Sequence, residues 1–310
     1  MSSETDNISR RLKLPAIVCA GLVVFLTACG SGGSLSDSGK LSVVTTFYPL
    51  QYLAERIGGD RVSVRNLVPP GIELHDWEPK PRDVTAIKRA KAFVYQGAGL
   101  EWWAERVVDG LSASGPVAVK ATDGLALLRS NDGDAPFDSH VWLDPALYAE
   151  QAIAVRDALA KADPAGASVY SANLASLTGD LEKLTAEMKQ GLAKCARDTM
   201  VTSHAAFAYL AGRFGLKQVA VSGLSPEAEP SPARLRQVIE QVRREGATHI
   251  FFETLVSDAV AKTIAREAGV KTLVLNPIEG LSKDELKAGA SYFTVQRQNL
   301  ANLRTALECA

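Results

Sequence analysis

The chain has 310 residues, and its formal net charge of −1 reflects 34 basic and 35 acidic side chains. Its 46% apolar and 22% charged residues are typical of a globular protein and exclude a disordered one. The length allows two domains of ~100–200 residues each, and the near-neutral charge gives no electrostatic reason to expect a nucleic-acid partner.

The first forty residues have the features of an export signal followed by a tether. Basic residues at positions 10, 11 and 13 precede an apolar run from Leu14 to Ala28, which is shorter than the ~20 residues that span a bilayer. We therefore expect residues 1–28 to be a signal peptide. The run ends in Leu26-Thr27-Ala28-Cys29-Gly30, which resembles the lipobox of bacterial lipoproteins and predicts a lipid anchor on Cys29. The alternative is a plain secretory signal with an incidental cysteine.

We expect residues 29–40 to form a flexible tether, because the Gly- and Ser-rich residues 30–39 cannot bury enough apolar surface to order themselves. These ten residues give a reach of roughly 16–19 Å. The chain is then exported and held at the membrane, on the periplasmic side or the outer face of the cell.

Beyond residue 40, short β-branched runs alternate with amphipathic segments. In the first half we expect strands over 41–46, 62–68, 92–95 and 117–120, with helices over 50–57, from 81 to 91 and after Glu101. In the second half we expect strands over 199–203, 217–221, 249–253 and 272–275, with helices over 205–214, from Pro232, over 258–268 and over 292–307. This alternation predicts two α/β lobes with mainly parallel sheets, over residues 41–162 and 197–310.

The segment 163–196 between the lobes carries an apolar stripe at spacings of three and four residues: Tyr170, Leu174, Leu177, Leu181, Leu184 and Met188. Such a stripe predicts one helix of ~30 residues and ~45 Å that runs down both lobes. We expect this rigid linking helix to resist a wide hinge opening.

Two cysteines remain once Cys19 and Cys29 are assigned to the signal and the lipid site. Because an exported protein occupies an oxidising compartment, we predict that Cys195 and Cys309 form a disulfide. The alternative is a pair of reduced, buried thiols.

Four ligand-type side chains follow strand-like runs in this pattern. His75 lies in a proline-rich loop over 68–81, His140 in a short β-rich run over 137–145, and His204 and Glu279 follow the strands that end near residues 203 and 275. Ligands of parallel α/β lobes bind beyond the carboxyl ends of the strands, and each half of the chain supplies two candidates. We therefore expect a site in the cleft between the lobes. Three imidazoles and one carboxylate suit Zn²⁺, whereas Ca²⁺ and Mg²⁺ prefer oxygen ligands.

Other polar residues near these four positions are not predicted to contact the metal directly. Glu253, at the end of a predicted strand, and Asp76, beside His75, are candidates for orienting a metal ligand from outside. His249 opens a strand and is more consistent with a structural role. The ligand spacing alone matches no local metal motif.

Several longer motifs occur in a fixed order: residues 45–49, 74–79, 140–145, 202–207, 223–232 and 276–281. They resemble those of the zinc/manganese solute-binding lipoproteins of bacterial ABC transporters, the cluster A-I or cluster 9 binding proteins, and the resemblance covers residues 41–308. It implies two lobes joined by a long helix, with metal ligation by His75, His140, His204 and Glu279.

The resemblance also implies a transported cargo of Zn²⁺, with an ABC permease and its ATPase as partners. Manganese members of the family tend to carry a carboxylate at the position of His204, so an imidazole there favours Zn²⁺. The segment 130–135 is short and lacks the histidines that many zinc members carry in this region.

Three alternatives stay open at this point. The first is a manganese-binding member of the same family. The second is an exported zinc hydrolase with Glu279 as general base, but no nucleophile or oxyanion motif accompanies it, and we expect no enzyme. The third is a surface adhesin, which no sequence feature indicates. We expect a monomer.

Overall fold

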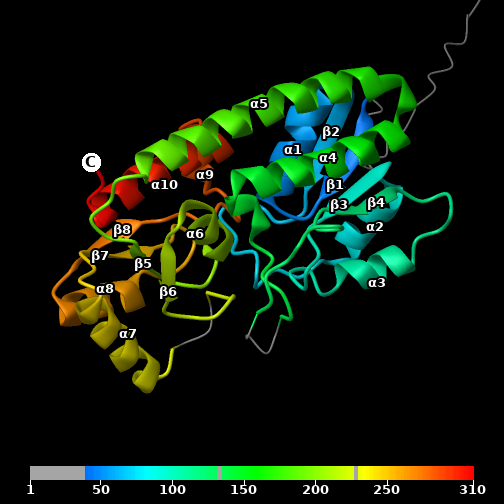
Figure 1. Ribbon diagram of the computed structural model, residues 1–310. Coiled ribbons are helices and arrows are strands. Elements are labelled where there is room, and N and C mark those ends of the chain that lie inside the picture. Colours follow the sequence, from blue (N-terminus) through cyan, green and yellow to red (C-terminus); the bar gives the residue numbers. More distant parts are fainter. Residues whose placement is uncertain (1–38, 131–134, 227–229) are drawn as a thin grey trace, which may run out of the picture. The chain divides into compact units, whose positions relative to one another are not determined.

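In residues 39–130, 135–226 and 230–310, which this computed structural model describes, eight strands form two separate four-stranded sheets (Figure 1). The predicted signal peptide 1–28, Cys29 and all but the end of the predicted tether lie outside these residues.

Both sheets are parallel throughout and share one topology. The first has the order β2-β1-β3-β4 and consists of β1 (Leu41–Thr45), β2 (Val62–Asn66), β3 (Ala92–Tyr95) and β4 (Val117–Lys120). The second has the order β6-β5-β7-β8 and consists of β5 (Thr199–Thr202), β6 (Lys217–Ala220), β7 (His249–Phe252) and β8 (Lys271–Val274). The two predicted α/β lobes are confirmed. In each sheet the strand order reverses between the two central strands, which is where such folds bind ligands.

Helices cover the two sheets. The first lobe has α1 (Tyr48–Gly58), α2 (Pro81–Arg89), α3 (Ala104–Asp109) and α4 (Pro145–Ala162). The second has α6 (Ala208–Phe214), α7 (Pro232–Arg244), α8 (Ala259–Ala268), α9 (Lys283–Lys287) and α10 (Tyr292–Leu307). Ser231 caps α7 by accepting a hydrogen bond from the Arg234 amide, and Pro232 occupies its first turn. None of the helices in the described ranges is both long and apolar enough to cross a membrane.

The linking helix α5 (Ala167–Gly191) lies along both lobes (Figure 1). Its 25 residues span about 37 Å, and Leu177, Leu181 and Leu184 enter a core cluster that includes residues of both lobes. Ion pairs join it to α1 through Arg56 and Asp180 and to α10 through Arg297 and Glu187. The helix is shorter than the predicted 163–196, because Asp163-Pro164 opens a separate 3₁₀ turn (Pro164–Gly166) and the chain leaves the helix after Gly191.

The end of the linking helix meets the end of the chain. The Cys195 and Cys309 Cα atoms lie 3.7 Å apart and their sulfur atoms are bonded at 1.97 Å. Backbone hydrogen bonds hold the two segments side by side, from the Arg197 amide to the Leu307 carbonyl and from the Ala310 amide to the Lys194 carbonyl.

Candidate metal centre

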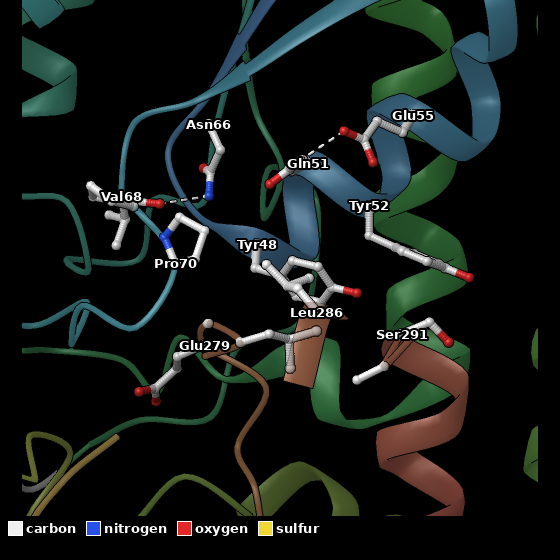
Figure 2. Close-up of a pocket in the computed structure, with 14 residues that line it drawn as sticks. Tyr48, Gln51, Tyr52, Glu55, Asn66, Val68, Pro70, Glu279, Leu286 and Ser291 are labelled. Atoms are coloured by element: carbon white, nitrogen blue, oxygen red, sulfur yellow. Dashed lines mark hydrogen bonds between the residues drawn. The ribbon is translucent and has the colours of Figure 1, made fainter. Parts of the chain in front are cut away.

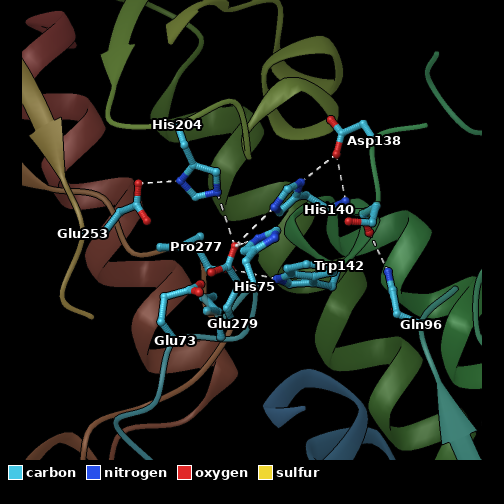
Figure 3. Close-up of polar contacts among 12 residues, drawn as sticks. Glu73, His75, Gln96, Asp138, His140, Trp142, His204, Glu253, Pro277 and Glu279 are labelled. Carbon is cyan, nitrogen blue, oxygen red and sulfur yellow. Dashed lines mark hydrogen bonds and ion pairs between the residues drawn. The ribbon is translucent and has the colours of Figure 1, made fainter. Parts of the chain in front are cut away.

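Three imidazoles and one carboxylate, contributed by both lobes, converge at one point (Figure 3). The ligand atoms of His75, His140, His204 and Glu279 all lie within 4.8 Å of one another. Glu279 Oε1 lies 3.5 Å from His75 Nε2, 3.2 Å from His140 Nε2 and 3.4 Å from His204 Nε2. The structure thus brings together all four predicted candidates.

The same four atoms are buried and have no hydrogen-bond partner of good geometry. A buried polar atom left without a partner costs about 1–3 kcal/mol, so four of them pointing at one place need an explanation. A cation held by all four supplies one, because each atom has a lone pair directed at the common centre.

Each ligand takes its place from local sequence. Prolines 69, 70, 79 and 81 restrict the loop of His75 between β2 and α2. His204 follows β5, and Glu279 follows β8 after a turn in which Asn276 Oδ1 accepts the Ile278 amide at 2.7 Å. The sequence predicted a short β-rich run around His140, and this prediction is wrong. His140 directly precedes a 3₁₀ turn, Val141–Leu143, because the Asp144-Pro145 pair begins α4 immediately afterwards.

Outer carboxylates orient two of the rings. His204 Nδ1 lies 2.6 Å from Glu253 Oε1, and His140 Nδ1 lies 2.8 Å from Asp138 Oδ1. Each contact fixes the ring so that Nε2 faces the common centre. Glu253 was a sequence candidate for this role. Asp138 was not, although its position two residues before His140 is a usable signal.

Asp76, the other sequence candidate for an orienting role, contacts a different residue. It is exposed, and its amide donates to Glu73 Oε2 at 3.2 Å. Glu73 lines a small pocket with Glu253 and Glu279. Burial and the charge of Glu279 raise the pKa of Glu73 to about 8.

The centre has the electrostatics of a cation site. Burial disfavours the charged form of His204, but the carboxylates of Glu253 and Glu279 outweigh it and raise its pKa to about 10. The pKa of His140 is also raised, with Asp138 and Glu279 overcoming burial. Burial opposes ionisation of Glu279 too, but the three imidazoles hold its pKa well below the usual range. Positive charge among these groups is therefore stabilised.

A larger pocket of about 260 Å³ lies beside this centre, lined by α1 and by residues of the 279–291 segment (Figure 2). Glu279 contributes to its wall, but its carboxylate is directed away from Tyr48, Tyr52 and Leu286 (Figure 2). Of the four candidate ligands, Glu279 alone belongs to the lining of this pocket.

The sequence of residues 43–306 matches a family described as the zinc-uptake complex component A, periplasmic, or ZnuA. The match covers more than half of the chain, and the chain belongs to this family of solute-binding proteins.

Among curated relatives, the zinc-binding lipoprotein AdcA of Streptococcus pneumoniae (strain ATCC BAA-255 / R6) is 37% identical over 304 residues, which are 94% of this chain and 60% of AdcA. The chain thus spans about 60% of the length of that relative. The high-affinity zinc uptake system protein ZnuA of Bacillus subtilis (strain 168) is 34% identical over 306 residues, 94% of this chain and 96% of that protein.

Among solved structures, the Zn(II)-bound ZnuA-like domain of Streptococcus pneumoniae AdcA is 40% identical with a TM-score of 0.78. It matches over 87% of this chain and 100% of that chain.

Proposed function

We propose that this chain captures Zn²⁺ outside the cytoplasm and delivers it to an ABC permease for import. The observation that carries the proposal is the convergence of four buried donor atoms without hydrogen-bond partners, from His75, His140, His204 and Glu279. Membership of the ZnuA family and the zinc-binding names of the relatives support the same cargo.

The donor set favours Zn²⁺ over Mn²⁺. Three nitrogen donors and one carboxylate oxygen match the tetrahedral coordination common for zinc, whereas Mn²⁺ prefers more oxygen ligands. An imidazole at His204, with its ring held by Glu253, makes the site softer than a carboxylate at that position would.

The geometry argues against the hydrolase alternative. A catalytic zinc keeps three protein ligands and an open position for water. Here Glu279 Oε1 points at the three Nε2 atoms from 3.2–3.5 Å, the place of a fourth ligand and not of a base acting on a bound water. The proposal therefore assigns capture and no catalysis.

We infer further that Cys29 carries the lipid that holds the chain near the permease, and that the chain acts as a monomer. The disulfide between Cys195 and Cys309 forms after export, which fits the oxidising compartment that a lipoprotein signal implies.

Calorimetric titration of the metal-stripped protein with Zn²⁺ and Mn²⁺ tests this function. We expect one tight Zn²⁺ site that Mn²⁺ does not displace, and weaker Zn²⁺ binding in Glu279→Ala. Glu182→Ala, which removes an exposed carboxylate of the linking helix, is the matched control and should bind as the wild type does. Equal or tighter Mn²⁺ binding moves the assignment to manganese, and Zn²⁺ binding indifferent to Glu279 reopens the hydrolase alternative.

A further inference from the structure

The four ligands of the centre differ in how firmly the protein holds them. The side chains of His140 and His204 are 0% exposed and that of Glu279 is 5% exposed, whereas that of His75 is 13% exposed. His75 is therefore the most exposed of the four ligand side chains, although its Nε2 atom is buried like the other three ligand atoms.

The segment of His140 is tied to the second lobe, although it precedes the linking helix in the sequence. Four hydrogen bonds, each of 2.7 Å, make this connection: Tyr209 Oη to the Asp138 carbonyl, Arg213 Nε to Asp144 Oδ2, Trp142 Nε1 to the Pro277 carbonyl and Tyr292 Oη to the Trp142 carbonyl. Gln96 of the first lobe adds a bond to the Ser139 carbonyl at 2.6 Å. The segment of His140 is thus joined by direct hydrogen bonds to the lobe that carries His204 and Glu279, and it also keeps a bond to the first lobe.

Asp138 and Glu253 fix the orientations of the His140 and His204 rings by contacting their Nδ1 atoms. Among the hydrogen bonds of the described residues, none holds Nδ1 of His75 in this way. Because an outer carboxylate both orients an imidazole and strengthens it as a ligand, His75 is the weakest-held of the three.

The backbone of the His75 loop is held by contacts that do not involve the imidazole. Leu74 is 6% exposed and anchors the loop in the core, while Ile72 is 44% exposed. The amides of Ile72 and Trp77 bond to carbonyls of the same loop, and the Gly71 amide bonds to the Leu281 carbonyl at 3.0 Å. A rotation of the His75 side chain about its own bonds therefore breaks none of these contacts.

We propose that His75 is the exchangeable ligand of the centre, through which the cation leaves by ligand exchange, and this inference rests on the proposed function. A donor side chain of the receiving protein approaches the exposed edge of His75, and its lone pair forms a new bond to the cation as the bond to His75 Nε2 breaks. When the incoming donor is a neutral imidazole, no proton or electron changes hands. His140, His204 and Glu279 retain the cation until the next donor arrives.

Chemical rescue with free imidazole tests this assignment. In His75→Gly, Zn²⁺ affinity falls, and imidazole at about 10 mM restores it at least tenfold, because the vacated space opens to solvent. His204→Gly creates a hole that is closed to solvent and should not respond. His249→Gly removes the remaining histidine, which lies at the start of β7 and contacts Thr248, and should bind Zn²⁺ as the wild type does with or without imidazole.

Two readouts separate coordination from folding. Chelator competition gives the Zn²⁺ dissociation constant, and the visible absorption of bound Co²⁺ reports whether imidazole enters the metal shell. Circular dichroism of the metal-free variants checks their folds. No recovery in His75→Gly, or an equal recovery in His204→Gly, overturns the inference.

Wild-type kinetics decide the question even when a glycine variant fails to fold. We expect the rate of Zn²⁺ transfer to a chelator to rise in proportion to chelator concentration, since the chelator attacks the bound cation. A rate independent of chelator concentration means that the cation leaves before any donor arrives and refutes the exchange. A wild-type protein that binds no Zn²⁺ refutes the proposed function itself, which is a distinguishable result.

Discussion

Replacing Glu101 with alanine should destabilise the protein strongly, although this residue lies in neither lobe's regular structure. Glu101 is 5% exposed and accepts hydrogen bonds from the Thr46 hydroxyl, from the Gln96 amide at 2.9 Å and from the Gly97 amide at 3.0 Å. It ties the carboxyl ends of β1 and β3 together at the point where the first sheet's strand order reverses.

The alanine variant leaves three buried donors without an acceptor. Each costs about 1–3 kcal/mol, and with relaxation of the site we expect a total loss of about 3–5 kcal/mol in the free energy of unfolding. That is a large fraction of the 5–15 kcal/mol typical of a folded domain.

Urea denaturation followed by circular dichroism measures the loss as a lower midpoint at an unchanged m-value. Glu105→Ala is the matched control, because Glu105 pairs only at the surface with Lys120 Nζ, at 2.9 Å, and such pairs are worth about 0–1 kcal/mol. A Glu101→Ala loss as small as that of Glu105→Ala would refute the reasoning.

The pH dependence of this effect has a definite sign. Burial raises the pKa of Glu101 above its ordinary value despite its hydrogen bonds. A carboxyl whose folded-state pKa is raised contributes stability that is fully present below its unfolded pKa and is lost as pH rises through the folded value. The stability difference between wild type and Glu101→Ala should therefore shrink from pH 4 to pH 8, and a difference that grows over this range contradicts the assignment.

Three further outcomes are expected. Zn²⁺ at one hundred times its dissociation constant should add about 2.7 kcal/mol to the free energy of unfolding. The measurement is a rise in melting temperature that a chelator reverses. If the melting temperature does not rise, Zn²⁺ does not bind preferentially to the folded state. Gly179→Ala in the linking helix should stabilise the protein by about 0.5–1 kcal/mol in urea denaturation, because no atom outside its chain neighbours and the adjacent helix backbone lies within 4 Å of the added Cβ. Destabilisation would show that the helix is strained there. Replacing Cys195 and Cys309 together with serine should cost about 2–5 kcal/mol, and an unchanged urea midpoint would mean that the disulfide does not form.

Much of the fold could be predicted from the sequence because its signals are local. The predicted strands at residues 92–95, with Phe, Val and Tyr, and at 117–120, with two valines, match β3 and β4 at both ends. The capping residues Ser231-Pro232 mark the start of α7. The four candidate ligands could be found because three of them follow parallel strands, whose carboxyl ends meet at one edge.

What the sequence could not predict depends on contacts between distant residues. The attachment of the His140 segment to the second lobe rests on bonds to Tyr209 and Pro277, which lie 71 and 135 residues from their partners. No periodicity encodes such pairs. The short helix α9 was also missed, because its capping box at Ser282 and Glu285 surrounds a segment too polar to show an apolar stripe.

The covalent topology of the second lobe follows from the Cys195–Cys309 disulfide, whose cysteines are 114 residues apart. The bond closes residues 195–309 into a covalent ring. The chain enters and leaves this ring at the same place, just beyond the end of the linking helix. A protease that cuts this ring once, at any loop between the two cysteines, releases no fragment, because both pieces stay joined through the sulfur atoms. Under non-reducing electrophoresis such a nicked chain still runs as one species, and two pieces separate only after reduction.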